Sequence, residues 1–224
     1  MSTTQEMVER RSTGVMTAGA AAEGFASIGA IVLSILGLTG QIPQILLPIA
    51  TIAVGASLLF EGGAVTARFS NLLSRARVPV DMSPLGMGLT TEFVSGIAGI
   101  VLGVLALIKI APLILIPVAA IVLGSSLLLG ASATARMNSA VAQMSEQREA
   151  VREVMSEAVF SAAGIQILAG IGVVVLGILA LIGMSPTILS FVSMLSLGVA
   201  TLLSGTVLIG RITAVSRRQH RATV

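Results

Sequence analysis

The sequence contains no cysteine, tryptophan or tyrosine and a single histidine, and only 10% of its 224 residues are charged. Without cysteine, the chain can form no disulfide, no thiolate metal site and no cysteine nucleophile. The absence of tryptophan and tyrosine removes the aromatic belt that often marks the two interfaces of a membrane protein. Charged residues normally make up about a quarter of a soluble chain. The charges present here are therefore too few to solvate the surface of a water-soluble fold.

Long apolar stretches take the place of the missing charges: 55% of the residues are hydrophobic, and the mean hydropathy is +1.02. Six stretches approach the ~20 residues that a helix needs to cross a bilayer core. They cover residues 23–39, 45–66, 92–110, 113–134, 160–183 and 187–210. Each successive pair is joined by a short turn with proline, which suits the first position of a helix, at Pro43, Pro112 and Pro186. Gly40 and Gly183 precede two of these turns and predict left-handed helix C-caps. The pattern predicts an all-α membrane protein with six transmembrane helices in three tandem hairpins.

The basic residues indicate the orientation of these spans. Of the 13 lysine and arginine residues, only Lys109 lies in a predicted hairpin turn. The positive-inside rule therefore predicts a multi-pass protein of the inner (plasma) membrane with both termini in the cytoplasm. The net charge of +3 follows from this topology, so we expect the lipid bilayer and no nucleic acid as a partner. Residues 1–11 are polar and lack the apolar core of a cleaved signal, so we expect the first span to direct insertion.

These boundaries give the predicted organisation of the chain. It comprises a cytoplasmic N-terminal segment over 1–22, hairpin repeat 1 over 23–68, a cytoplasmic connection over 69–91, hairpin repeat 2 over 92–136, a second connection over 137–157, hairpin repeat 3 over 158–211 and a basic C-terminal tail over 212–224. The second connection alternates charged and apolar residues, which predicts a cytoplasmic or interfacial helix. The first contains Pro79 and Pro84 and is expected to be partly irregular.

The three hairpins are related by an internal sequence repeat. A shift of 69 residues superposes the first hairpin on the second, and a further shift of 74 superposes the second on the third. Val101-Leu102-Gly103 recurs as Val175-Leu176-Gly177, and Pro112 recurs as Pro186. Equivalent units should bury equivalent faces, so the repeat predicts a bundle with pseudo-threefold symmetry.

A stripe of small residues follows the first helix of each hairpin at offsets of three and four residues. Its members are Ser27, Ser34, Gly37, Gly96, Gly99, Gly103, Gly170 and Gly177. Small residues permit the close backbone approach that drives helix association in lipid. We expect the three first helices to meet along these stripes near the pseudo-threefold axis, and contacts within each hairpin are the alternative. Gly55, Gly124 and Gly198 on the second helices are expected to support lateral self-association.

Polar residues stand at equivalent positions one helical turn before the stripe, at Glu23, Glu92 and Gln166. Ionisable groups at membrane depth usually face a partner or a wet cavity. Hairpin geometry offers a partner to each in turn, namely Arg68, Arg136 and Arg211. One interpretation is a set of structural ion pairs that fixes the register of each hairpin. The other is a polar mouth that admits a proton or cation, although the stripe contains no further carboxylate to continue a relay.

Glu61 stands apart from this set and is expected to pair with Arg68 or Arg10, or to mark a bend at the adjacent glycines. His220, the only histidine, lies in the basic tail, and no histidine or aspartate in the spans could activate a serine or threonine. We therefore predict no catalytic, metal or cofactor site and no enzymatic activity.

The second repeat resembles the repeat of the HdeD-like small membrane proteins. The resemblance rests on the stretch from Gly96 to Leu107, the turn at Pro112, Gly124 and the stretch from Leu127 to Gly130. It implies an inner-membrane protein linked to acid or stress tolerance, with no catalytic residues to carry over. The sequence then favours a non-enzymatic membrane protein that acts through helix packing and assembly, as a homo-oligomer or scaffold. A passive proton or cation conduit and an accessory subunit of a larger membrane complex are the alternatives.

Overall fold

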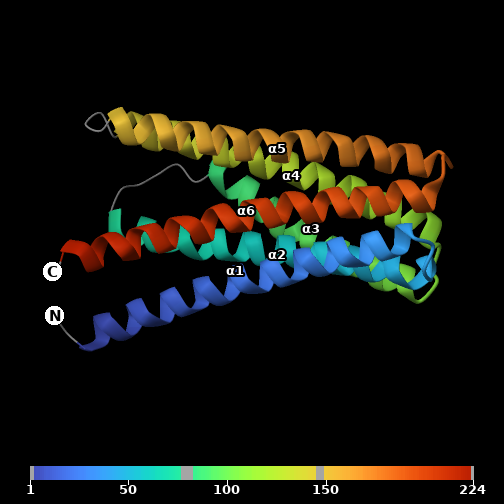
Figure 1. The fold of residues 1–224 in the computed structure, drawn as a ribbon, viewed down its shortest axis with the longest axis horizontal. Coiled ribbons are helices and arrows are strands. Elements are labelled where there is room, and N and C mark those ends of the chain that lie inside the picture. The colour runs from blue at the N-terminus through green and yellow to red at the C-terminus, as the bar shows by residue number, and fades with distance from the viewer. Residues whose placement is uncertain (1–2, 77–82, 145–148, 223–224) are drawn as a thin grey trace.

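The computed structural model describes residues 3–76, 83–144 and 149–222, with side chains described over 21–62, 91–131 and 164–204. These residues are helical except for three short turns. The helices are α1 (Thr3–Leu38), α2 (Pro43–Ala76), α3 (Ser83–Leu107), α4 (Pro112–Met144), α5 (Glu149–Leu181) and α6 (Pro186–Ala222). They lie side by side along one long axis (Figure 1). The predicted all-α fold with six helices is confirmed.

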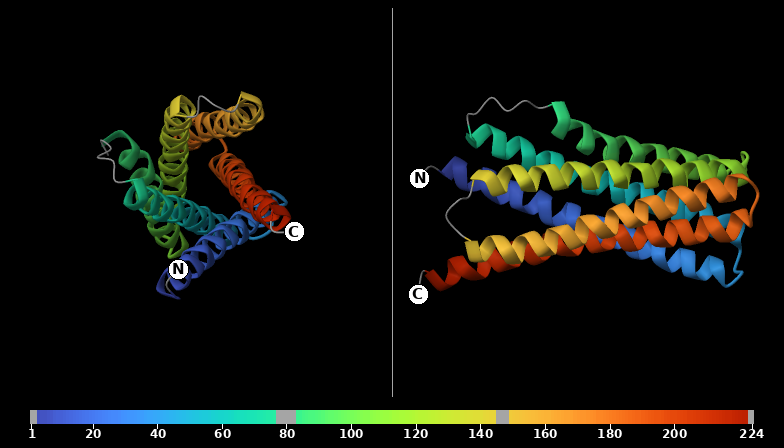
Figure 2. Two further views of the ribbon diagram at one scale, coloured as in Figure 1. Left: turned by 90° about the vertical axis from the view of Figure 1, so that its left-hand side faces the viewer. Right: turned by 90° about the horizontal axis from the view of Figure 1, so that it is seen from above.

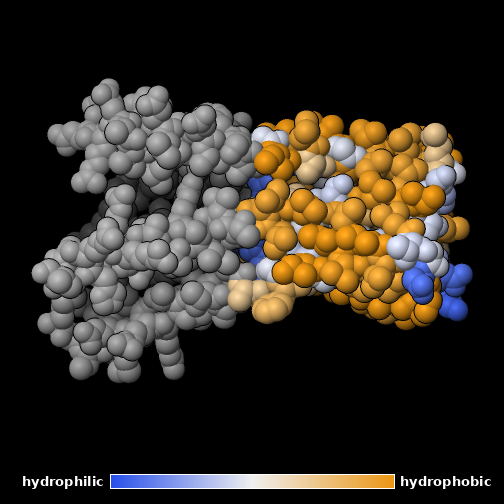
Figure 3. Space-filling view, viewed as in Figure 1, coloured by the Kyte–Doolittle hydropathy of each residue, from blue (hydrophilic) through white to orange (hydrophobic). Residues whose placement is uncertain are grey.

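Five of the six helices contain an apolar segment long enough to cross a membrane. These segments are Ala21–Leu38, Pro43–Gly62, Pro112–Ala131, Gly164–Leu181 and Pro186–Ser204. The described apolar part of α3, Thr91–Leu107, is shorter. Figure 3 shows that the described part of the bundle presents an almost continuous hydrophobic face. The described part of the bundle therefore has the lipid-compatible exterior that the composition predicts.

The long connections differ from their predicted form. Residues 137–144 continue α4 and residues 149–157 begin α5, so the described part of this connection belongs to the two flanking helices and not to a separate one. Pro84 is the second residue of α3 and falls in its first turn, where a proline costs no hydrogen bond. Helical propagation adds one hydrogen bond for each residue that is fixed, which explains why an established helix extends into a polar segment.

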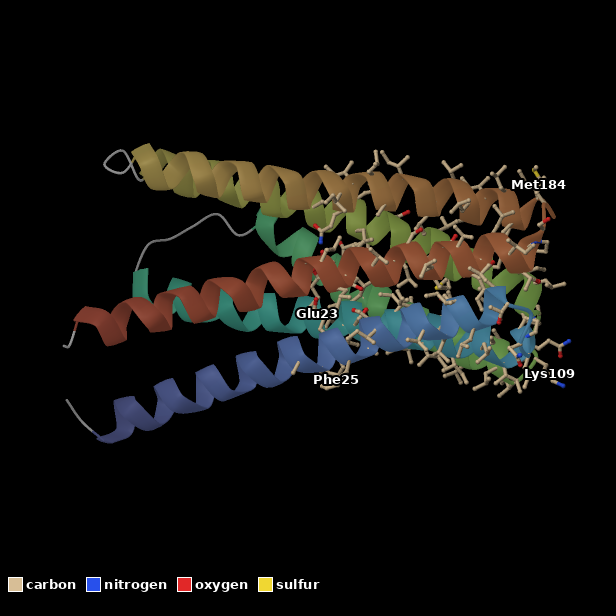
Figure 4. All side chains as sticks on the ribbon, viewed as in Figure 1. Glu23, Phe25, Lys109 and Met184 are labelled. Atoms are coloured by element: carbon tan, nitrogen blue, oxygen red, sulfur yellow. The ribbon has the colours of Figure 1, made fainter. Side chains whose placement is uncertain are left out.

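The three hairpin turns, 38–43, 107–112 and 181–186, lie together at one end of the bundle, here called the turn end (Figures 1 and 4). Gly40 and Gly183 have φ of 86° and 95°, which confirms the predicted left-handed C-caps. Lys109 occupies the same place after α3 with φ 67°, an uncommon conformation for a residue with a side chain. The amide N–H groups of Lys109 and the next residue donate to carbonyl oxygens of the last turn of α3, at 3.0 Å each. The left-handed C-cap therefore forms after α3 even though lysine takes the place of glycine there.

The helices form a ring in which each contacts the next along the chain and α1 contacts α6. The second helices of the hairpins, α2, α4 and α6, also contact one another, whereas α1, α3 and α5 do not contact one another within the described residues. Figure 2 shows this arrangement along the bundle axis. The most deeply buried large apolar side chains come mainly from the second helices, namely Val54, Leu58, Leu123, Leu127, Phe191, Met194 and Leu197. The prediction that the first helices meet at the axis is therefore wrong.

The small-residue stripes pack between neighbouring hairpins. A Cβ added to Gly96 on α3 would lie 2.7 Å from the carbonyl oxygen of Gly55 on α2, and a Cβ on Gly103 would lie 3.1 Å from the carbonyl oxygen of Pro48. On α5, a Cβ at Gly170 would lie 2.9 Å from the carbonyl oxygen of Gly124 on α4. The alternative of contacts within each hairpin does not describe these three glycines. It describes Gly99 in part, since a Cβ there would lie 2.9 Å from the Leu123 side chain on α4 of the same hairpin and 3.3 Å from Gly55 on α2. The stripe fixes which face of a helix packs closely, but its periodicity carries no information about the partner.

The contact between α6 and α1 closes the ring in the same manner. A Cβ at Gly198 on α6 would lie 3.3 Å from the carbonyl oxygen of Ser27 on α1. Gly55, Gly124 and Gly198 are thus buried in contacts between hairpins. These three glycines are therefore not on the outer surface where they could support lateral association, because each accommodates the first helix of a neighbouring hairpin.

Candidate functional site: a buried carboxyl cluster

Three glutamates are buried at one level of the bundle. Glu23 on α1 is 1% exposed, and Glu61 on α2 and Glu92 on α3 are each 6% exposed. Glu23 and Glu92 lie about 22 Å from the turn end, at a helical rise of about 1.5 Å per residue. Gln166, the third member of the predicted polar set, is only half-buried. The described carboxyl groups therefore gather on α1, α2 and α3, near the border of the apolar segments.

The position of Glu23 is set by the amphipathic surface of α1. Figure 4 shows Glu23 directed toward the neighbouring helices and Phe25, two residues later, on the outer side. Phe25 is 78% exposed. Residues two apart on a helix point in different directions, so a large apolar residue faces outward while the carboxyl group faces the bundle.

Glu92 packs against the second helix of its own hairpin. Its carboxyl group lies over Gly130 on α4, where an added Cβ would overlap it. Glu92 also lies within electrostatic range of Glu61 and Glu23. Glycine at position 130 thus provides the space that the carboxyl group fills, and three carboxyl groups share one buried region.

Glu61 forms a side-chain hydrogen bond with Ser204 on α6. This contact differs from the predicted pairing with Arg68 or Arg10, whose side chains lie outside those that the structure describes. The notional counterpart of Glu61 in the third hairpin is Ser204, whereas the second hairpin is one residue shorter here and has none. The hydrogen bond of Glu61 with Ser204 and its electrostatic interaction with Glu92 put these three residues in one region of the bundle.

The predicted partners Arg68, Arg136 and Arg211 also lie outside the residues whose side chains the structure describes. The pairings of Glu23, Glu92 and Gln166 with these arginines stay predictions.

A second polar contact joins the first and last helices close to the carboxyl groups. The Ser27 and Thr201 hydroxyl oxygens are 2.9 Å apart, and the Thr201 hydroxyl donates to the carbonyl oxygens of Leu197 and Gly198 at 3.1 Å each. Each hydroxyl has one hydrogen and can also accept, so either Ser27 or Thr201 can be the donor. Ser27 of the small-residue stripe thus adds a hydrogen bond to the close approach of α1 and α6.

Apolar side chains occupy the centre of the bundle between the carboxyl groups and the turn end. Val54, Leu58, Leu123, Met194 and Phe191 are each at most 1% exposed. Close packing of this kind leaves little room for water beside the chains. Buried hydroxyl groups lie among these apolar side chains, at Ser34, Thr51, Ser57, Ser126, Ser190 and Ser193. The carboxyl groups thus lie at one end of a packed core that contains hydroxyl groups but no further described carboxyl group.

Within the described side chains, no group of three or more histidine, cysteine, aspartate or glutamate residues is placed to hold a metal ion. The three carboxyl groups are near enough to interact electrostatically but are not arranged as a coordination shell.

No protein-family model, no curated protein and no solved structure matches this chain. Its class follows from its own features, an apolar helical bundle with several helices long enough to cross a bilayer. These features are consistent with an integral, multi-pass membrane protein. The resemblance to the HdeD-like proteins stays a prediction from the residues of the second repeat.

Proposed function

We propose that this protein is a non-enzymatic integral membrane protein that acts through helix packing and assembly, as a structural or scaffold component of the membrane. The observation that carries the proposal is the packed centre of the bundle, where leucine, valine, methionine and phenylalanine side chains from α2, α4 and α6 are buried. A protein built in this way offers its outer surface, and not an interior passage, to its surroundings.

The proposed architecture has six membrane spans in three hairpins related by pseudo-threefold symmetry. It is supported by the three contacts between hairpins, which use equivalent residues of the sequence repeat: Gly96 with Gly55, Gly170 with Gly124, and Ser27 with Gly198. α3 has 25 residues, about 37 Å at the helical rise, which is enough to cross a hydrocarbon core of about 30 Å. We include α3 as the sixth span on this basis.

The proposed setting is an inner membrane with both termini in the cytoplasm. Its support is the position of the basic residues outside the hairpin turns, with Lys109 as the exception. The outer face carries large exposed side chains such as Phe25, Leu168 and Ile182 at 78%, 76% and 71% exposure. Lipid acyl chains, a second copy of this chain or another membrane protein are the partners that suit such a surface. Membership of the HdeD-like family and a role in stress tolerance are part of the same proposal.

A proton or cation conduit is the second candidate, and the buried carboxyl groups of Glu23, Glu61 and Glu92 favour it. Ionisable groups at membrane depth commonly mark ion pathways. The apolar side chains between these carboxyl groups and the turn end oppose it, because an ion there would lose its hydration without compensation.

Flux measurements in proteoliposomes separate the two candidates. We expect the native protein to carry no proton or cation flux above that of empty liposomes, because large apolar side chains fill the core. The hydroxyl groups buried there, such as Thr51, Ser57 and Ser193, donate to carbonyl oxygens of their own helices. The same measurement on a Glu23→Gln, Glu92→Gln double variant is expected to give the same result. An added ionophore confirms that the vesicles are sealed, and circular dichroism confirms that both proteins are folded. Flux that the native protein supports and the double variant loses would establish the conduit and overturn the scaffold.

A further inference from the structure

The hydrogen bonds around Glu61 and Ser204 depend on whether Glu61 carries a proton. Glu61 is 6% exposed and is hydrogen-bonded to Ser204. The Ser204 hydroxyl also donates to the carbonyl oxygen of Thr201 on its own helix, at 2.9 Å. A serine hydroxyl has one hydrogen and two acceptor lone pairs. That one hydrogen can go to Thr201 or to Glu61, and when it goes to Thr201 the Ser204 oxygen accepts from Glu61.

A carboxylate has no hydrogen to give, whereas a carboxylic acid has one. The pair of hydrogen bonds around Ser204 is therefore satisfied only when Glu61 carries a proton. The second carboxyl oxygen of Glu61, Oε2, is buried and makes no hydrogen bond with the side chains or backbone that the structure describes. An ionised carboxylate would leave charge on this oxygen without a donor, which is costly in an apolar interior.

The neighbours of Glu61 add to this cost. Of the described side chains, the titratable groups around it are Glu92 on α3 and Glu23 on α1, and both are acidic. The other helices packed against α2 contribute Ser204 on α6 and, beneath Glu92, Gly130 on α4. Like charges in one buried region disfavour each other.

We propose that Glu61 is a proton-binding site, and that its carboxyl group is a neutral acid that donates a hydrogen bond to Ser204 and so links α2 to α6. The ligand is a proton taken from water at the end of the bundle opposite the turns. Its release leaves a carboxylate beside Glu92 and Glu23 and removes the hydrogen that Ser204 accepts. The contact between α2 and α6 at this level then weakens, so the bundle is most stable while the proton is bound and loses stability as the pH rises.

This inference goes beyond the proposed scaffold, because it concerns a proton that is bound and not one that crosses the membrane. Infrared spectroscopy of the protein in proteoliposomes at neutral pH tests it, since a protonated carboxyl group gives a carbonyl band separate from that of a carboxylate. We expect the native protein to show such a band and Glu61→Gln to lose one component of it. Ser204→Ala should shift the same component to higher frequency, because the acid loses its acceptor. Glu153→Gln, at a position on α5 remote in sequence from the cluster, is the matched control and should leave the band unchanged.

A carboxylic acid band that is absent from the native protein, or that is identical in Glu61→Gln, would show that Glu61 is ionised and would overturn the proposal. If Glu61→Gln does not fold, Ser204→Ala decides, and an unshifted band in that variant contradicts the proposed hydrogen bond. A negative flux experiment leaves this result unaffected, so the scaffold and the proton site can fail separately.

Discussion

Replacement of Gly96 by alanine is expected to destabilise the bundle by about 2–3 kcal/mol, near the upper part of the usual range for overpacking a core. The added Cβ would lie 2.7 Å from the Gly55 carbonyl oxygen and 2.8 Å from the Leu59 amide nitrogen. Both atoms belong to the backbone of α2, so no side-chain rotation can make room. The two helices must separate, and the close contact along the stripe is lost.

Gly29→Ala is the matched control for this prediction. Gly29 also lies within a transmembrane segment, on α1, but a Cβ there meets nothing within 4 Å. Alanine in a helix is favoured over glycine by about 0.5–1 kcal/mol, so this variant should be slightly more stable than the native protein. Thermal unfolding in detergent, followed by circular dichroism, gives both values. Equal melting temperatures for the two variants would contradict the close packing of α3 on α2.

The contact between Gly37 and Phe191 is expected to give the second large effect. A Cβ on Gly37 of α1 would overlap the ring of Phe191 on α6, which is 1% exposed. In the repeat, alanine takes the place of Gly37 in the other two hairpins, and proline takes the place of Phe191. The smallest residue at the first position, Gly37, therefore occurs together with the only aromatic ring at the second position, Phe191.

A double-mutant cycle tests this size complementarity. Gly37→Ala alone should cost about 1–3 kcal/mol through overpacking, and Phe191→Leu alone should be destabilising because it leaves a cavity. The double variant should be more stable than the sum of the two effects predicts, with a coupling energy of about 1 kcal/mol or more, because the methyl group of alanine enters the space that the ring vacates. Unfolding of the four proteins under one condition gives the coupling. Additive effects would mean that the two residues do not touch.

Local features of the fold were predictable from the sequence, and the partners of each helix were not. The turn prolines and the C-caps at Gly40 and Gly183 follow from the conformational limits of those residues, and the structure reproduces them. The stripe that includes Gly96 and Gly103 marks a packing face for the same reason. The identity of the helix opposite that face depends on how three hairpins arrange themselves around one another. Local periodicity is the same for every such arrangement.

The carboxyl cluster was likewise predictable in its local features and not in its contacts between helices. The burial of Glu23 and Glu92 agrees with their predicted position on the face of the small-residue stripe. Glu61 was predicted to pair with Arg68 or Arg10, or to mark a bend at the adjacent glycines, because a charge in an apolar segment suggests an ion pair. Its hydrogen bond with Ser204 joins helices from the first and third hairpins, and only the closure of the ring brings them together.

Disulfide cross-linking tests the ring most directly, because the chain contains no cysteine of its own. The hydroxyl oxygens of Ser27 and Thr201 are 2.9 Å apart although the residues lie near opposite ends of the chain. A Ser27→Cys, Thr201→Cys double variant is therefore expected to form an intramolecular disulfide under mild oxidation in the membrane. Ser27→Cys combined with Val199→Cys should not, because Val199 is exposed on another face of α6. Cross-linking of the first pair alone is the result that a closed ring predicts. Failure of the first pair, in protein shown to be folded, would contradict the contact between α1 and α6.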